Sequence, residues 1–459
     1  MIAIAVNSSI VDSRRVPRRQ VKLLSSGRFC LNSGRNSLFA RTFCYKTIRR
    51  PQFKDSPQQK KPQREFPKQD VPLAKQISAR IQATGPITVA SYMKEILTNP
   101  SGGYYMSKDV FGREGDFITS PEVGQIFGEM VAIWILTEWR KIGSPKPLQL
   151  VELGPGRGTL AQDILRVLTQ LGLSSPDLSV HLVEISPFMC QAQANRLCFT
   201  HDEVTDPQSK HHYAGETLSG VKIFWYRSLE DVPRNFSIFY AHEFFDALPV
   251  HKLERKDGIW KEVLVDLDPG KDDTFRFVMS RAETPASKVF TQLSGQFADQ
   301  RDHIEFSLDA LNVINQMADR LEENGGFSLI MDYGHNGDKS DTFRAFRQHQ
   351  LHNPLENPGQ ADLTADVDFK QLKFAAEKSQ KVITFGPIFQ SDFLQRLGSD
   401  VRLKVLLENA KGDQKTDLET GYNLLTHPDK MGHRFKFFAI FPRVLESILQ
   451  KLPLSGFTQ

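Results

Sequence analysis

The pattern of hydrophobic and polar positions predicts an alternation of short strands and helices from residue 148 onward. The apolar run 148–153 predicts a strand, the glycines after it predict a tight loop, and apolar residues at helical spacing from Leu160 to Leu168 predict a helix. Similar runs predict strands over 180–184, 221–226, 237–241 and 327–331. Five strands with intervening helices indicate an α/β, Rossmann-like fold, whose ligands bind at the carboxyl edge of a mostly parallel sheet.

Two later runs extend this sheet. Residues 381–385 and 435–441 are rich in β-branched and aromatic side chains and predict an antiparallel finish. Between the fourth and fifth strands, the pattern predicts the short strands of a small β insertion over 250–300. We expect this insertion to overhang the carboxyl edge of the sheet.

The chain before residue 146 is predicted to be helical. Residues 87–97 predict one helix. A second is predicted to begin with Ser120 as N-cap, Pro121 at the first helical position and Glu122 in the first turn. The hydroxyls of Thr119 and Ser120 then lie at a helix N-terminus just upstream of the glycine loop, which makes both residues candidates for cofactor binding.

The composition of the N-terminal segment predicts where in the cell the protein is located. Residues 1–50 hold nine Arg and two Lys but one acid, so they carry about +10 while the whole chain carries +4. An Arg-rich, Ser-containing, acid-poor segment is typical of a mitochondrial transit peptide, which predicts the mitochondrial matrix. The alternative is a basic arm for nucleic acid; it is less favoured because no nucleic-acid motif follows, and no nucleic-acid partner is expected.

Composition divides the rest of the chain. The predicted parts are a disordered linker over 51–75, an N-terminal helical region over 76–145, the α/β domain over 146–442 and a C-terminal tail over 443–459. No run approaches the roughly 18–20 apolar residues of a membrane span, so we expect a soluble mature protein. Four cysteines without a C-x-x-C pair favour neither a disulfide scaffold nor structural zinc, and no metal is expected.

The glycine loop predicts a nucleotide-like ligand. Gly154, Gly156 and Gly158 allow a sharp turn and close approach of the backbone to a ligand at a helix N-terminus. The dinucleotide fingerprint G-x-G-x-x-G needs Gly or Ala where Thr159 stands, which argues against a pyrophosphate. With Glu152 two residues before its first glycine, the loop resembles the E/D-x-G-x-G-x-G loop of S-adenosylmethionine-dependent methyltransferases. A plain strand-to-helix turn is the alternative.

Two further positions are cofactor candidates. Glu184 ends the strand after the glycine loop, where a carboxylate can accept hydrogen bonds from both ribose hydroxyls. An ordinary exposed acid at a strand end is the alternative. The turn at Leu229, after the third strand, is the candidate for adenine contacts, although it could equally begin a helix.

Carboxylates follow the fourth and fifth strands. Glu243 and Asp246 come just after one, and Asp332 after the other. Such groups can hold a guanidinium by paired hydrogen bonds and aim one nitrogen at a methyl group, so these three are the catalytic candidates. Capping or salt-bridge roles are the alternative for each.

Four blocks make a resemblance specific. They are GDFITSPE over 115–122, LVELGPGRGTL over 150–160, HEFFDALP over 242–249 and ADLTADVDF over 361–369. Together they resemble the signature blocks of the MidA-like methyltransferases. The resemblance covers roughly 80–442 and is strongest to the mitochondrial branch. It implies a seven-stranded class I methyltransferase fold and S-adenosyl-L-methionine as cofactor.

For that mitochondrial branch, the resemblance further implies symmetric dimethylation of an arginine on a core matrix-arm subunit of complex I, and a role in complex I assembly. Bacterial relatives commonly have Asn where His242 stands, so no catalytic role is assigned to His242. Two other functions stay open: a non-catalytic assembly chaperone that retains the fold, and a Rossmann oxidoreductase, which Thr159 disfavours. The oligomeric state is not predicted.

Overall fold

A computed structural model describes residues 71–106, 118–297 and 301–457. The main sheet is built from β2 (Leu148–Leu153), β3 (Leu178–Val183), β4 (Thr200–Glu203), β5 (Tyr213–Glu216), β6 (Lys222–Tyr226), β7 (Ser237–His242), β12 (Gly326–His335), β17 (Val382–Phe389) and β18 (Phe435–Pro442). They lie in the order β17-β18-β12-β7-β2-β3-β6-β5-β4, and β16 (Val367–Asp368) pairs with the end of β12.

Seven of these strands form the predicted sheet. The strands from β6 to β12 run parallel, and β18 is antiparallel to both β12 and β17. The α/β fold with one reversed strand is therefore confirmed. The antiparallel pair β4 and β5 widens the sheet beyond β6, which the sequence analysis did not predict.

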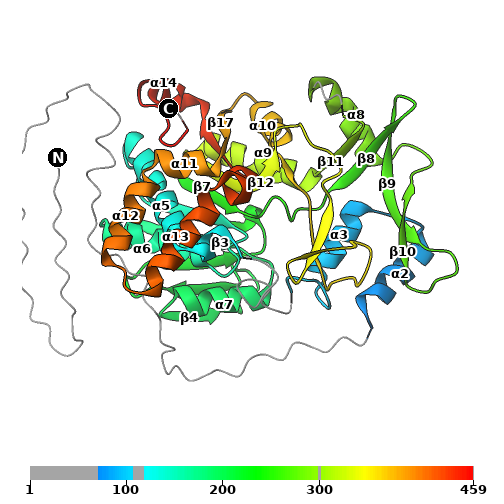
Figure 1. The fold of residues 1–459 in the computed structure, drawn as a ribbon, viewed down its shortest axis with the longest axis horizontal. Helices are drawn as coiled ribbons and strands as arrows, with labels where there is room; N and C mark the ends of the chain where they lie inside the picture. Colours follow the sequence, from blue (N-terminus) through cyan, green and yellow to red (C-terminus); the bar gives the residue numbers. More distant parts are fainter. Residues whose placement is uncertain (1–70, 107–117, 298–300, 458–459) are drawn as a thin grey trace, which may run out of the picture.

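Helices cover both faces of the sheet (Figure 1). They are α5 (Gln125–Lys141), α6 (Thr159–Gln170), α7 (Pro187–Leu197), α9 (Leu308–Asn324), α10 (Phe369–Glu377), α11 (Gln390–Arg396), α12 (Ser399–Asn409) and α13 (Asp413–Thr426). On β2, Leu150 packs with Trp134 of α5 in one core, whereas its neighbour Val151 packs with Ile314 of α9 in the other. Successive strand residues point to opposite faces, so one strand contributes to both cores.

A second sheet forms the β subdomain at one end of the molecule (Figure 1). It contains β1 (Ile87–Thr88), β8 (His251–Lys256), β9 (Ile259–Leu267), β10 (Phe275–Met279) and β11 (His303–Phe306). Helix α8 (Pro285–Phe297) lies between β10 and β11 in the chain and contacts β9. The predicted short strands are thus present. The unit also recruits β1 from the N-terminal region and extends to β11.

The N-terminal helical region does not form one unit. Helices α2 (Leu73–Thr84) and α3 (Val89–Thr98) pack against the β subdomain, in a core that includes Tyr92 and Val265. Helix α5 instead packs on the main sheet. The predicted linker also ends too late, since α2 begins at Leu73. The predicted transit peptide and most of the predicted linker lie outside the described residues.

The predicted helix start at Ser120 is wrong in detail. Thr119 is the N-cap of a single turn, α4 (Ser120–Val123), and its side chain makes no capping hydrogen bond. Gly124 has φ 175° and ψ 165°, which is extended backbone, so the helical hydrogen bonding stops there and α5 begins anew at Gln125. The separate turn lets Ser120 lie against the site described below.

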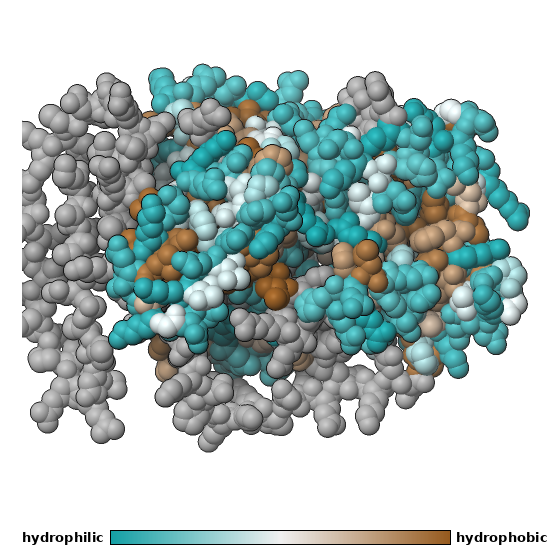
Figure 2. All heavy atoms as spheres, viewed as in Figure 1, coloured by the Kyte–Doolittle hydropathy of each residue, from teal (hydrophilic) through white to brown (hydrophobic). Residues whose placement is uncertain are grey.

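The remaining elements complete the surface. A three-stranded sheet joins β13 (Arg344–Arg347), β14 (Gln350–His352) and β15 (Asp362–Thr364). The predicted tail is packed, because α14 (Glu446–Lys451) buries Leu449 and the Trp134 indole donates to the Ser455 carbonyl at 2.9 Å. On the face shown in Figure 2, hydrophobic residues lie in separate patches among hydrophilic ones.

Candidate active site

The three loop glycines bring bare backbone to the carboxyl edge of the sheet. Gly154, Gly156 and Gly158 have φ angles of 63°, 52° and 74°, in the left-handed region that favours glycine. A Cβ on Gly154 would lie 2.8 Å from the ring of Phe244. Gly158 is the N-cap of α6, so the free N–H groups of that helix lie beside the loop. The loop therefore fits close against the segment after β7.

Glu152 is buried inside the sheet. It lies on β2 opposite Tyr240 of β7 and is 2% exposed. Burial raises the pKa of its carboxyl to about 8. A hydrogen bond from the Tyr240 side chain lowers this pKa and so opposes the effect of burial. With Tyr240 as its side-chain donor, the carboxylate can still accept from a ligand that carries N–H groups, such as an ammonium group.

Glu184 directly follows β3 and is half-buried. Its Oε1 accepts the Ser186 N–H at 2.8 Å, and its Oε2 accepts Nε2 of Gln193 at 3.0 Å. Burial raises the pKa of Glu184 to about 6. The Ile185 N–H also bonds to this carboxylate. Three donors leave part of its capacity of about four hydrogen bonds open to a hydroxyl of a diol.

Gln193 joins the two predicted cofactor elements. Its Nε2 donates to the Gly156 carbonyl at 2.6 Å as well as to Glu184, and its Oε1 accepts the Trp225 indole N–H at 2.8 Å. The residue lies on α7 and is fully buried. Sequence reasoning missed it; the available signal was a glutamine on the buried face of the helix that follows Glu184.

The side chain of Leu229 is buried in the core and does not face the predicted cofactor site. The residue begins the turn η1 (Leu229–Asp231), is 4% exposed, and packs in the core with Tyr226 and Val232. Its carbonyl accepts a hydrogen bond from Arg320 at 2.6 Å. A contact to adenine from this turn would therefore have to involve other atoms than the Leu229 side chain.

Glu243 directly follows β7 in an unusual conformation. Its φ of 50° is costly for a residue with a side chain, and its N–H donates to the Met331 carbonyl at 3.0 Å. The Ser120 N–H bonds to its carboxylate. Its Oε1 accepts no hydrogen bond from the described residues, and Nε2 of His242 lies 3.6 Å from it. Burial, and then the charge of Asp246, raise the pKa of Glu243 well above its ordinary value.

Asp246 is held from one side and open on the other. Its Oδ2 accepts hydrogen bonds from the Tyr333 phenol and from Thr364 Oγ1, the latter at 2.9 Å. Its Oδ1 has no partner within the described chain, although the residue is only 6% exposed. Burial raises the pKa of this carboxyl, whereas the two hydroxyl donors lower it. Tyr333 and Thr364 were not among the predicted site residues.

Asp332 has a different environment from the other two catalytic candidates. Its Oδ2 accepts the N–H groups of Phe244, Phe245 and Asp246 at 3.2, 3.0 and 3.4 Å, and its Oδ1 accepts the Tyr333 N–H at 2.9 Å. These four amides use its lone pairs. Asp332 therefore organises the turn that carries Glu243 and Asp246, which is the capping alternative weighed for it above.

His242 is neutral and packed. Burial lowers the pKa of its imidazole to about 3. Its ring stacks on Phe435 with centroids 6.0 Å apart and meets the edge of Phe127 at 5.1 Å. These contacts give His242 a packing role beside Glu243.

A fourth carboxylate belongs to the same edge. Asp362 on β15 accepts the Tyr105 phenol at 2.6 Å, and Ser186 Oγ donates to the Tyr105 carbonyl at 2.7 Å. Asp362 adds to the charge that raises the pKa of Glu243. The block 361–369 pointed to this segment, but neither Tyr105 nor Asp362 was assigned a role from the sequence.

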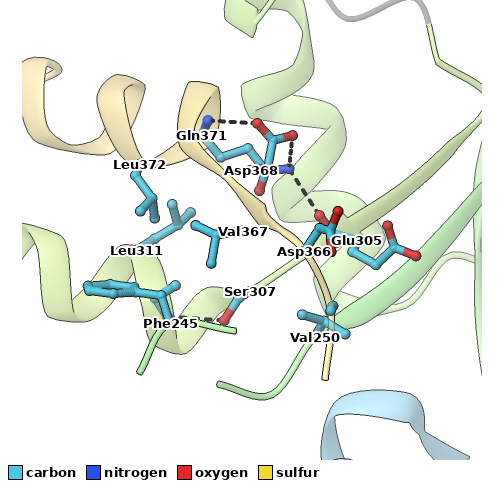
Figure 3. A pocket seen from close by; sticks show the side chains of 12 residues that line it. Phe245, Val250, Glu305, Ser307, Leu311, Asp366, Val367, Asp368, Gln371 and Leu372 are labelled. Carbon is cyan, nitrogen blue, oxygen red and sulfur yellow. Dashed lines mark hydrogen bonds between the residues drawn. The ribbon is translucent and has the colours of Figure 1, made fainter. Parts of the chain in front are cut away.

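A small cavity of about 30 Å³ borders Phe245, which lies between Glu243 and Asp246 in the sequence (Figure 3). Phe245, Val250 and Leu311 line one part of it, and Glu305 and Asp368 another. This volume suffices for about one water molecule, so the cavity is not the cofactor site.

Within the described ranges, no group of three or more His, Cys, Asp or Glu side chains is arranged so as to hold a metal ion. No helix among them combines the length and apolar character needed to cross a membrane.

Comparisons with known proteins identify the family. The model for S-adenosyl-L-methionine-dependent methyltransferases matches residues 130–388. The mitochondrial protein arginine methyltransferase NDUFAF7 homolog of Drosophila melanogaster is 51% identical over 91% of this chain and 98% of its own. The chain belongs to this methyltransferase family. The human protein arginine methyltransferase NDUFAF7, mitochondrial, is 49% identical over 81% of this chain and 83% of its own.

Solved structures agree on the fold of the methyltransferase. A COG1565 superfamily member from Burkholderia thailandensis, bound to S-adenosyl-homocysteine, superposes with a TM-score of 0.64, at 20% identity, over 84% of this chain and 92% of that one. The cofactor of the family is S-adenosyl-L-methionine, which supplies an electrophilic methyl group when bound. The residues present fit it: a glycine cradle that a side chain would fill, a buried carboxylate in Glu152 and a diol acceptor in Glu184.

Proposed function

We propose that this methyltransferase transfers methyl groups to an arginine side chain of a protein. The observation that carries the proposal is a pair of buried carboxylate oxygens that accept no hydrogen bond from the described residues, Oε1 of Glu243 and Oδ1 of Asp246. The nitrogen nearest to the first is Nε2 of His242, at 3.6 Å, which is beyond hydrogen-bond distance. Both residues follow β7, next to the strand that leads into the glycine loop. A guanidinium carries five N–H donors in a planar arrangement, so it can supply the hydrogen bonds that these two oxygens lack.

The carboxylates would hold and orient the nucleophile. A free guanidinium has a pKa above 12, so it enters protonated and poorly nucleophilic. Glu243 and Asp246 would accept its N–H groups and offset its charge while one nitrogen is aligned with the methyl donor. Burial raises the pKa of Glu243, so this carboxylate is also suited to take up the proton that the nitrogen loses. Asp332 would act as a positioning residue through its bonds to the backbone of this turn.

The cofactor side is assigned in the same way. The backbone of the glycine loop would admit the amino-acid portion of the cofactor, Glu152 its ammonium group and Glu184 its ribose hydroxyls. Thr119 and Ser120 lie at the start of α4, and the Ser120 N–H bonds to Glu243. Ser120 therefore supports the substrate carboxylate, and a direct cofactor contact from either hydroxyl is part of the proposal.

The finer proposal names a substrate. We infer symmetric dimethylation of an arginine on a core subunit of the complex I matrix arm, in the mitochondrial matrix and in support of complex I assembly. The support is the set of mitochondrial relatives named as protein arginine methyltransferases, together with the Arg-rich N-terminal 50 residues.

The test is methyl transfer from tritiated S-adenosylmethionine to each recombinant core subunit of the matrix arm, followed by mass spectrometry of the labelled arginine. Variants Glu243→Gln and Asp246→Asn should each lower the rate by a hundredfold or more, since each removes one negatively charged acceptor of the guanidinium. Calorimetry with S-adenosylhomocysteine is the control, and both variants should bind it as the parent does.

Three results would contradict parts of the proposal. Unchanged transfer by Glu243→Gln would exclude the carboxylate pair as the guanidinium clamp. Labelled residues other than arginine would exclude the substrate class. A parent that binds S-adenosylhomocysteine and the subunit but transfers no methyl group would favour the assembly chaperone.

A further inference from the structure

An exposed arginine stands beside the proposed substrate site. Arg434 precedes β18, and its guanidinium carbon lies 5.4 Å from the centre of the Tyr333 ring. Tyr333 is the residue whose phenol holds Asp246. Within the described part of the chain, no hydrogen bond or ion pair is found for the Arg434 side chain, and the residue is exposed. The ring of Tyr333 thus lies between the positive charge of Arg434 and the carboxylate of Asp246.

The neighbouring cation differs from Arg434. Arg344 lies 5.5 Å from the same Tyr333 ring, but its guanidinium bonds to Asp366 at 2.7 Å and to the Thr342 carbonyl at 2.8 Å. Its charge is therefore compensated. Lys436 lies two residues after Arg434, and its ammonium group donates a hydrogen bond to the Gly334 carbonyl at 2.6 Å. Of these three described cations, Arg434 is the one whose side chain remains available to a partner.

The surface beside Arg434 suits an extended peptide. His433 stacks on Phe389 with centroids 4.2 Å apart, and both residues are exposed. A flat aromatic platform and a neighbouring guanidinium together offer contacts to a chain that passes the pocket.

We propose that Arg434 selects the methylation site by pairing with an acidic residue next to the target arginine. This inference rests on the proposed arginine methylation, and it specifies the substrate class as an arginine with a carboxylate neighbour. With the target arginine at Asp246, an acidic neighbour would be attracted to the guanidinium of Arg434. A basic neighbour would be repelled by it.

The experiment uses the full chain with S-adenosylhomocysteine and fluorescent peptides that present one arginine with Glu, Gln or Lys at adjacent positions. Binding is measured by fluorescence anisotropy, so the result does not depend on methyl transfer. The parent should bind the Glu peptide about threefold to fivefold more tightly than the Gln peptide, the range of a solvent-exposed ion pair, and the Lys peptide more weakly still. The preference should shrink as salt is added.

Charge reversal gives the decisive comparison. Arg434→Glu should invert the ranking so that the Lys peptide binds best, and Arg434→Gln should flatten it. The matched control is Arg140→Glu, the same change at an exposed residue of α5 just before β2, at the opposite edge of the sheet. It should keep the parental ranking.

An unchanged ranking in Arg434→Glu, or equal binding of all three peptides by the parent, would overturn the inference. The tritium assay separates this result from failure of the proposed function. Methylated arginine without charge preference would reject only the role of Arg434, whereas label on another residue type would reject arginine methylation itself.

Discussion

The phenol of Tyr105 donates a hydrogen bond of 2.6 Å to Asp362, a residue 257 positions later in the chain. Burial, and then the charge of Asp362, raise the pKa of Tyr105 well above its ordinary value, so the phenol keeps its proton and acts as the donor. The carbonyl of Tyr105 is held by Ser186, two residues beyond Glu184. One residue therefore contacts both the segment with the predicted ribose acceptor and a carboxylate of the substrate edge.

The first prediction concerns this donor. Tyr105→Phe should lower kcat/KM for the methylated protein about tenfold or more, because a hydrogen bond to a charged group contributes about 1.5–3 kcal/mol. The affinity for S-adenosylhomocysteine should change by less than twofold, since the Ser186 bond to the backbone remains. Tyr92→Phe is the matched control, because it removes a phenol that donates to the Pro354 carbonyl at 3.1 Å. Equal losses in both variants would indicate a general packing effect.

The second prediction concerns Gln193. Gln193→Leu should weaken binding of S-adenosylhomocysteine by about tenfold, since the Gly156 carbonyl and Glu184 would both lose a donor. Gln191→Leu, on the same helix and without a hydrogen bond found for its side chain among the described residues, should bind like the parent. Calorimetric titration of both variants measures the difference. Parental affinity in Gln193→Leu would mean that the loop and Glu184 are held without it.

Periodicity predicted the parts of the fold that depend on neighbouring residues. The strand at 148–153, the glycine loop and the helix after it are encoded within about 20 residues, and the acids at strand ends follow from the parallel order. The placement of Glu243 and Asp246 beside the glycine loop was predictable for that reason. Their roles in catalysis stay a prediction.

Other parts depend on contacts that no local pattern encodes. Tyr105 reaches Asp362, and β1 pairs with β9, only because α2 and α3 pack on the β subdomain. The role of Asp332 was open for the same reason. Its position after a strand fitted catalysis, and only the three-dimensional turn reveals the four amides that it accepts.

A third prediction concerns stability. Glu129 of α5 is buried and bonds to Arg402 at 2.7 and 3.1 Å and to Arg166 at 3.1 Å. Glu129→Ala should lower the free energy of unfolding by about 3–5 kcal/mol, because two largely buried guanidinium groups lose a partner. Glu95→Ala, which breaks an exposed pair with Arg80, should cost less than about 1 kcal/mol. Urea denaturation measures both, and similar losses would contradict a special role for the buried pair.

The last prediction concerns the pH dependence of cofactor binding. Burial raises the pKa of Glu184 to about 6 in the protein without ligand. Ribose hydroxyls donate to the ionised carboxylate, so binding should lower this pKa and release a proton. Affinity for S-adenosylhomocysteine should therefore rise as the pH increases toward 6, by up to about tenfold per unit. Calorimetry in buffers of different ionisation enthalpy detects the released proton directly.

Glu152 should cause a second rise in cofactor affinity, in a higher pH range than Glu184. Burial raises its pKa to about 8, so a bound ammonium group that favours its ionised form should make affinity rise further between pH 6 and 8. Glu184→Gln should remove only the lower rise, and Glu152→Gln only the upper one. An upper rise that persists in Glu152→Gln would mean that another group accepts the ammonium. A lower rise that persists in Glu184→Gln would exclude Glu184 as the ribose acceptor, because the amide cannot titrate there.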